Sequence, residues 1–147
     1  MKLVFTKGSG KNDRLVIDRP DGSSEEIACP KQGIIPHDMM HYAVESALHM
    51  RGFLGRVKDG EVATFGMVSE SESDSIERLV EVMQGETWSG LIPVDELIDL
   101  YRVTCTARGC PLLELNAQVI ADIRGRIASL SKDWDAVSIG QTLTLAF

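Results

Sequence analysis

Two histidines and a carboxylate recur at helical spacing in the first third of the chain. His37 and His41 are four residues apart, and Glu45 follows after four more. On a helix, positions four apart differ by only about 40° around the axis, so these side chains share one edge. Imidazoles at this spacing can both reach one zinc ion, which needs nitrogen–metal distances of about 2.0–2.1 Å. The pattern predicts the ligand helix of a divalent-metal site, with zinc as the expected ion.

The role of Glu45 in the predicted site has two alternatives. His37 and Glu45 are eight residues apart, which is about 12 Å along a helix axis, so one ion reaches both only with strain. Glu45 is therefore either a metal ligand or a carboxylate that orients His41 through a hydrogen bond. In the second case another residue completes the ligand set, and there are two candidates: Glu61 and Cys29.

The helix that carries these residues is predicted to run from Pro36 to about Arg51, with Gly52 as its C-terminal stop. Its apolar residues define a core-facing stripe made of Met40, Ala43, Val44, Ala47 and Leu48. The polar residues run along one flank of this stripe, which places them at a rim, with apolar packing on one side and solvent or a cleft on the other. A structural interpretation stays open: the histidines are partly buried and hydrogen-bonded, and Asp38 interacts with the free amides of the first turn.

The remaining pattern predicts an α+β fold in a single domain over residues 1–147. Three short strands joined by turns occupy the first thirty residues, and the alternating segment 142–147 is a fourth strand. We expect one four-stranded antiparallel sheet, covered on one face by about four helices. In addition to the histidine helix, we expect helices over residues 71–84, 93–109 and 115–130. Residues 53–68 contain glycine breaks at Gly60 and Gly66 and carry no predicted element.

Composition excludes several classes of protein. The chain has 147 residues, 44% of them hydrophobic, and a formal net charge of -7. An acidic chain without a basic cluster is not expected to bind nucleic acid or an anionic membrane surface. No apolar run approaches the roughly 20 residues that span a bilayer. The three cysteines, Cys29, Cys105 and Cys110, cannot all pair within one chain. A reducing cytoplasm is the expected compartment.

The segment from Cys29 to Glu45 resembles the signature of a family of small uncharacterised bacterial proteins, CPxQGxxPHDxxHYxVE. The resemblance extends over most of the chain, including residues 101–105 and the final strand. It implies a shared fold and brings no established activity.

Three better-known motifs match the histidine helix in part. The spacing is similar to the zincin motif His-Glu-x-x-His, and the resemblance implies Asp38 as the candidate general base, one methylene shorter than glutamate. It is also similar to the His-Asp-x-x-His of a coenzyme Q biosynthesis family, whose downstream glutamate falls near Phe53. The HD phosphohydrolases share the His37-Asp38 pair but need a histidine further upstream, and His37 is the first histidine of this chain.

Two functions remain open on the sequence alone. The first is a divalent-metal-binding protein that uses His37, His41 and Glu45 as ligands, and that could be a metal-dependent hydrolase with Asp38 as its base. The second is a non-catalytic interaction module or homodimeric structural protein, in which an exposed sheet face or edge receives a partner. Whether the protein is an enzyme is not decided by its sequence.

Overall fold

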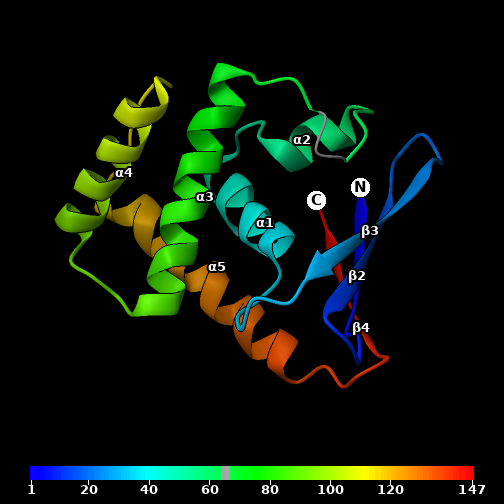
Figure 1. The fold of residues 1–147 in the computed structure, drawn as a ribbon. Coiled ribbons are helices and arrows are strands. Elements are labelled where there is room, and N and C mark those ends of the chain that lie inside the picture. The colour runs from blue at the N-terminus through cyan, green and yellow to red at the C-terminus, as the bar shows by residue number, and fades with distance from the viewer. Residues whose placement is uncertain (64–66) are drawn as a thin grey trace.

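The fold is a four-stranded antiparallel sheet with helices packed on one of its faces (Figure 1). The computed structural model describes residues 1–63 and 67–147. Its elements follow the chain in the order β1 (Lys2–Thr6), β2 (Asn12–Asp18), β3 (Ser24–Pro30), α1 (His37–Leu48), α2 (Phe53–Lys58), α3 (Ser71–Ser89), α4 (Val94–Arg108), α5 (Ala117–Asp135) and β4 (Thr142–Ala146). The predicted α+β class and four-stranded sheet are confirmed.

The C-terminal strand completes the sheet beside the N-terminal one. The strand order is β3-β2-β1-β4, and β1 pairs antiparallel with both β2 and β4. The two chain ends meet at the same edge, where the Met1 ammonium donates to the Phe147 carbonyl at 2.8 Å. Strand β4 therefore occupies the side of β1 that β2 leaves free and forms one edge of the sheet.

Alternation along the strands explains why only one face carries helices. Leu3 and Phe5 of β1 and Leu15 and Ile17 of β2 are fully buried against the helices. Their neighbours in sequence point to the other face, where Val4 lies opposite both Val16 and Thr144. The alternation of hydrophobic and polar residues thus gives the sheet one face that the helices bury and one face that they leave uncovered.

Helix α1 lies at the centre of the helical layer and ends earlier than its sequence predicts. It packs against α5, α3 and α2. The prediction that it continues to Arg51 is wrong, because the chain leaves the helix at His49, which has a left-handed backbone with φ of 52°. Gly52 is consequently not the helix stop. It is buried beside Glu45 and precedes α2.

The other helices differ from prediction mainly in length. Helix α3 continues through Gly85 to Ser89, and α5 continues to Asp135. Helix α4 ends at Gly109 with a φ of 75°, as its sequence indicates. Helix α2 is an element that hydrophobic periodicity does not predict, and Gly66 lies outside the described residues. No helix in the described ranges is both long and apolar enough to cross a bilayer.

Candidate metal centre

The rings of His37 and His41 meet on one face of α1. The helix begins at His37, directly after Pro36. The two Nε2 atoms are 3.2 Å apart, and the rings pack edge to face with centroids 4.8 Å apart. The His41 side chain is only 3% exposed and packs against Phe53, whereas that of His37 is 39% exposed. The histidines therefore form a half-buried pair that reaches from the core to the surface.

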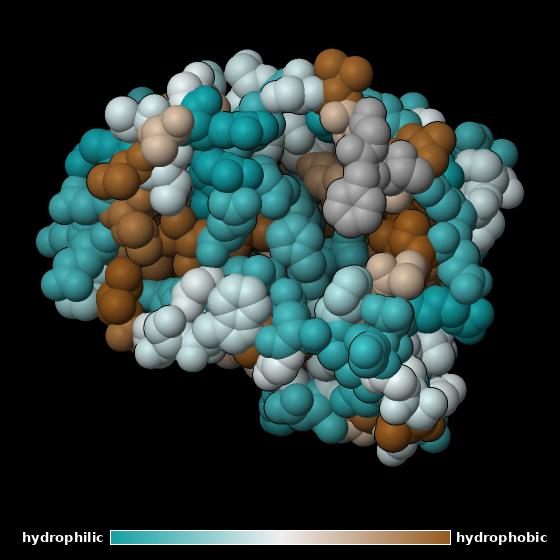
Figure 2. Space-filling model, viewed as in Figure 1, coloured by the Kyte–Doolittle hydropathy of each residue, from teal (hydrophilic) through white to brown (hydrophobic). Residues whose placement is uncertain are grey.

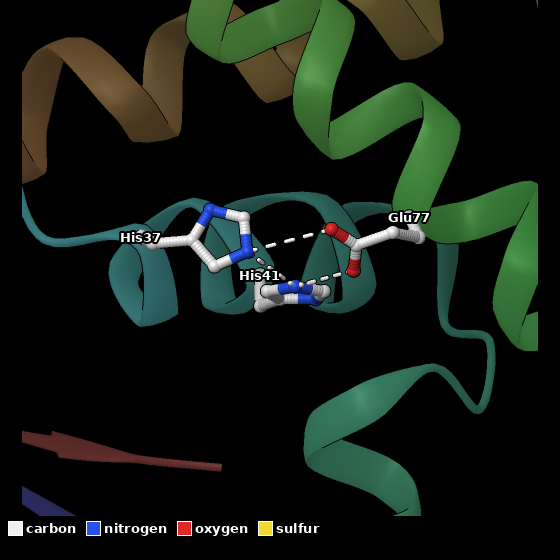
Figure 3. A group of neighbouring side chains, drawn as sticks. All are labelled: His37, His41 and Glu77. Atoms are coloured by element: carbon white, nitrogen blue, oxygen red, sulfur yellow. Dashed lines mark hydrogen bonds and ion pairs between the residues drawn. The ribbon is translucent and has the colours of Figure 1, made fainter. Parts of the chain in front are cut away.

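Helix α3, which packs on α1, contributes a carboxylate to this pair. The oxygens of Glu77 lie 2.9 Å from His41 Nε2 and 3.5 Å from His37 Nε2 (Figure 3). Ligand atoms of a tetrahedral zinc site lie about 3.3 Å from one another, because each is about 2.0–2.1 Å from the ion. The His37–His41–Glu77 group therefore has the spacing of a divalent-metal site, and its ligand atoms all lie within 4.8 Å of one another.

Glu45 fixes the orientation of His41 from the side opposite Glu77. Its Oε1 lies 3.2 Å from His41 Nδ1 and also accepts from the backbone N–H of Leu54. Its Oε2 accepts from the backbone N–H groups of Gly52 and Gly55, each at 3.0 Å. A carboxylate held by three backbone donors is an acceptor only, so Nδ1 of a neutral His41 carries the hydrogen. The lone pair of His41 is then on Nε2, facing Glu77.

Gln84, two turns after Glu77 on α3, does the same for His37. Its side-chain oxygen lies 2.9 Å from His37 Nδ1 and accepts a second hydrogen bond from Gln32 Nε2 at 3.2 Å. The donor from Gln32 keeps the amide oxygen turned toward the imidazole. His37 Nδ1 therefore carries its hydrogen, and its Nε2 lone pair also faces the common point.

Three hydrogen-bond acceptors therefore face one another with no donor between them: the Nε2 atoms of His37 and His41 and the carboxylate of Glu77. Two imidazole lone pairs and a carboxylate about 3 Å apart in a half-buried position repel one another unless a positive charge joins them. A metal ion and a proton are the two candidates for that charge. Outer hydrogen bonds that fix which nitrogen faces the ion are characteristic of histidine ligands to metals.

The proton is a strong competitor at this site. Burial alone lowers the pKa of His41, but hydrogen bonds to Glu45 and Glu77 outweigh it and raise the pKa to about 10. The pKa of His37 is also raised, because hydrogen bonds to Glu77 and Gln84 outweigh its burial. The pKa of Glu77 is held far below its ordinary value, since its bonds to the two histidines outweigh the effect of burial. The cluster thus favours an added positive charge.

The sequence-predicted residues are placed as follows. Glu45 is outside the His37–His41–Glu77 group and holds His41, the second of its predicted roles. It lies in the interior and not at a rim, because the chain folds back over its carboxylate. Asp38 points toward the sheet and accepts from the Cys29 thiol at 3.4 Å, so neither residue joins the group. Glu61 pairs with Arg56 instead.

Glu77 and Gln84 are the residues of the candidate site that sequence reasoning missed. Glu77 has the appearance of one more acid on the solvated face of an acidic helix. Its signal is its position next to the apolar stripe, with a polar residue seven positions later on the same side of the helix. That signal becomes specific only when α3 is known to pack on α1.

We expect Gly52→Ala to destabilise the protein by about 1–3 kcal/mol, the usual effect of overpacking. A Cβ at this position would lie 2.7 Å from the carboxyl carbon of Glu45 and 2.9 Å from Ile76 Cγ2. Urea unfolding measures the change. The matched control is Gly125→Ala on α5, where an added Cβ meets nothing within 4 Å. Equal stability of the two variants would contradict the proposed packing.

Comparison with known proteins gives no match: no family model, no curated protein and no solved structure is similar to this chain. The resemblance noted for residues 29–45 therefore stays a prediction, and the function must be argued from the site itself.

Proposed function

We propose that the protein binds one divalent transition-metal ion through His37 Nε2, His41 Nε2 and a carboxylate oxygen of Glu77. The observation that carries the proposal is the convergence of these acceptors, with both Nδ1 atoms already committed to Glu45 and Gln84. Two imidazoles and one carboxylate form a ligand set that suits zinc. Zinc is therefore the ion that we propose.

The proposed metal site has the features of a catalytic site and not only of a structural one. Three protein ligands leave a fourth position, as in catalytic zinc sites, and Glu77 and His37 are 30% and 39% exposed. A water at that position would have its pKa lowered toward neutrality, so metal-dependent hydrolysis is the activity class that we propose. Asp38 is not included as general base, because its carboxylate is engaged with Cys29. The unpaired thiols support a reducing compartment such as the cytoplasm.

Zinc titration of untagged, chelator-treated protein tests the binding proposal. We expect one ion per chain by calorimetry, and a thermal shift that corresponds to about 2.7 kcal/mol when free zinc is one hundred times the dissociation constant. His37→Ala is the sharpest variant, because its partly exposed side chain can be removed with little loss of packing. No binding heat and no thermal shift in the wild type would refute the proposal.

Zinc binding is expected to release protons at pH 7. The pKa of His41 is about 10 without metal, so its imidazolium must lose a proton before Nε2 can bind the ion. Calorimetry in two buffers of different ionisation enthalpy counts the protons, and we expect at least about one. Affinity should weaken by up to roughly tenfold per released proton for each pH unit of acidification. Binding with no proton release would contradict this assignment of His41.

The metal-free protein should show the opposite dependence in its stability. A folded-state pKa of about 10 lies above the ordinary histidine value of 6.5, so the imidazolium of His41 contributes its full stability below about pH 6.5. That contribution is lost as the pH rises through about 10.

A further inference from the structure

The C-terminal end of α4 brings two of the three cysteines together. The chain leaves the helix at Gly109, which has a φ of 75° and donates its N–H to the Thr106 carbonyl at 3.2 Å. The N–H of Cys110 donates to the Cys105 carbonyl, also at 3.2 Å. These two hydrogen bonds define a Schellman motif, which commonly packs the residue after the glycine against the residue five positions before it. In this chain both of those residues are cysteines.

The backbone of this motif suits a disulfide between Cys105 and Cys110. The 3.2 Å hydrogen bond and standard bond lengths limit the two Cα atoms to at most about 7 Å apart, and the bends along that path shorten the distance. A disulfide spans Cα atoms that are about 4.4–6.8 Å apart. The Cys110 thiol also donates to the Cys105 carbonyl, with the sulfur 3.9 Å from the oxygen. The helix end therefore holds the two side chains within reach of each other.

The two thiols differ in their access to solvent and in their surroundings. Cys105 is 2% exposed, whereas Cys110 is partly exposed. Burial raises the pKa of the Cys105 thiol, and the neighbouring Cys110 thiol adds to this effect. The positive charge of Arg78 on α3 acts in the opposite direction, because it favours the Cys105 thiolate. An accessible cysteine beside a second cysteine that can resolve its oxidised form is the arrangement of redox-sensitive sites.

We propose that Cys105 and Cys110 form a reversible disulfide when the protein meets a small-molecule disulfide such as glutathione disulfide. The Cys110 thiolate attacks one sulfur of the oxidant, which breaks its S–S bond, and the released glutathione thiolate takes up the proton that Cys110 lost. The Cys105 sulfur then attacks Cys110 Sγ and displaces the second glutathione, which leaves with the Cys105 proton. The chain loses two hydrogens and the oxidant becomes two thiols. In a reducing compartment glutathione reverses both steps.

The disulfide would tie α4 to the segment that follows it. This helix packs on α3, and hydrophobic surface remains visible along the line where the two helices meet (Figure 2). Beyond the cysteine pair, the Pro111 carbonyl accepts from Ser75 of α3, and the Leu113 N–H donates to the Tyr101 hydroxyl. Amide hydrogen exchange over residues 109–113 should therefore be slower in the oxidised protein. Equal exchange in the two forms would contradict this consequence.

Intact-mass measurement on reduced, chelator-treated protein tests the proposal after incubation with glutathione disulfide. We expect the wild type to lose two hydrogens and retain no glutathione, and its free thiols to fall from three to one per chain. Trypsin cleaves after Arg108, between the two cysteines, so the bridge should join the two resulting peptides. Cys105→Ala removes the resolving thiol, and Cys110 should then retain one glutathione.

The matched control is Cys29→Ser, which removes the third thiol and keeps a hydroxyl donor for Asp38. This variant should lose two hydrogens as completely as the wild type, because Cys29 has no part in the bridge. A wild type that keeps its three thiols, or that retains glutathione on Cys110 as Cys105→Ala does, would overturn the proposal. A bridge that joins Cys29 or two separate chains would overturn it as well.

Discussion

Replacing His41 with alanine is expected to weaken zinc binding by more than about a hundredfold, beyond the usual loss for a residue that only orients a ligand. His41 contributes one of the proposed ligand atoms, and its Nε2 lies 2.9 Å from Glu77 and 3.2 Å from His37 Nε2. Without it the ion would keep only one imidazole and one carboxylate. Calorimetry of the chelator-treated variant measures the loss directly.

The matched control for this variant is His49→Asn. His49 is the exposed residue that ends α1 in a left-handed conformation, which asparagine accepts readily. The His49→Asn substitution removes an imidazole four residues beyond Glu45 and should leave zinc affinity unchanged. His37→Ala should behave like His41→Ala in binding and retain more stability, because His37 is less buried. Wild-type affinity in a folded His41→Ala protein would remove His41 from the ligand set.

Replacing Glu45 with alanine is expected to lower the free energy of unfolding by roughly 3–5 kcal/mol, even with excess chelator present. The carboxylate is 1% exposed and accepts the backbone N–H groups of Gly52, Leu54 and Gly55 as well as facing His41. Its removal leaves these donors unpaired in the interior, each at a cost of about 1–3 kcal/mol before water or relaxation compensates. Urea unfolding followed by circular dichroism measures the change.

Two further variants isolate the cause. Glu45→Gln keeps the shape but turns an NH2 group toward backbone donors, so its stability should lie between those of the wild type and Glu45→Ala. Glu114→Ala removes an exposed carboxylate and should change stability by no more than about 0.5 kcal/mol. A loss of less than about 1 kcal/mol in Glu45→Ala would show that the turn at residues 52–55 does not depend on this carboxylate.

The sheet could be predicted from sequence because its signals are local. Turn residues separate the first three strands, and alternation over Thr142–Ala146 marks the fourth. Helix ends were harder where tertiary contacts decide them. Glu45 accepts hydrogen bonds from the backbone N–H groups of Gly52 and Gly55, which hold the start of α2 close to α1. Hydrophobic periodicity does not reveal these hydrogen bonds.

The candidate site was half predictable for a geometric reason. His37 and His41 share one helix, so spacing alone brings their rings together. Glu77 is 36 positions after His41 and reaches them only through the packing of α3 on α1. Sequence spacing does not reveal that packing. The sequence-based prediction therefore favoured acidic residues that lie closer to His41 in the chain.

Anomalous diffraction at the zinc absorption edge, from crystals of untagged protein grown with zinc, tests the central claim most directly. The account predicts one strong peak per chain, about 2.0–2.1 Å from the Nε2 atoms of His37 and His41 and at a similar distance from a Glu77 oxygen. No peak between these side chains, with the His41 ring still hydrogen-bonded to Glu45 and Glu77, would show that the cluster holds a proton and not a metal ion.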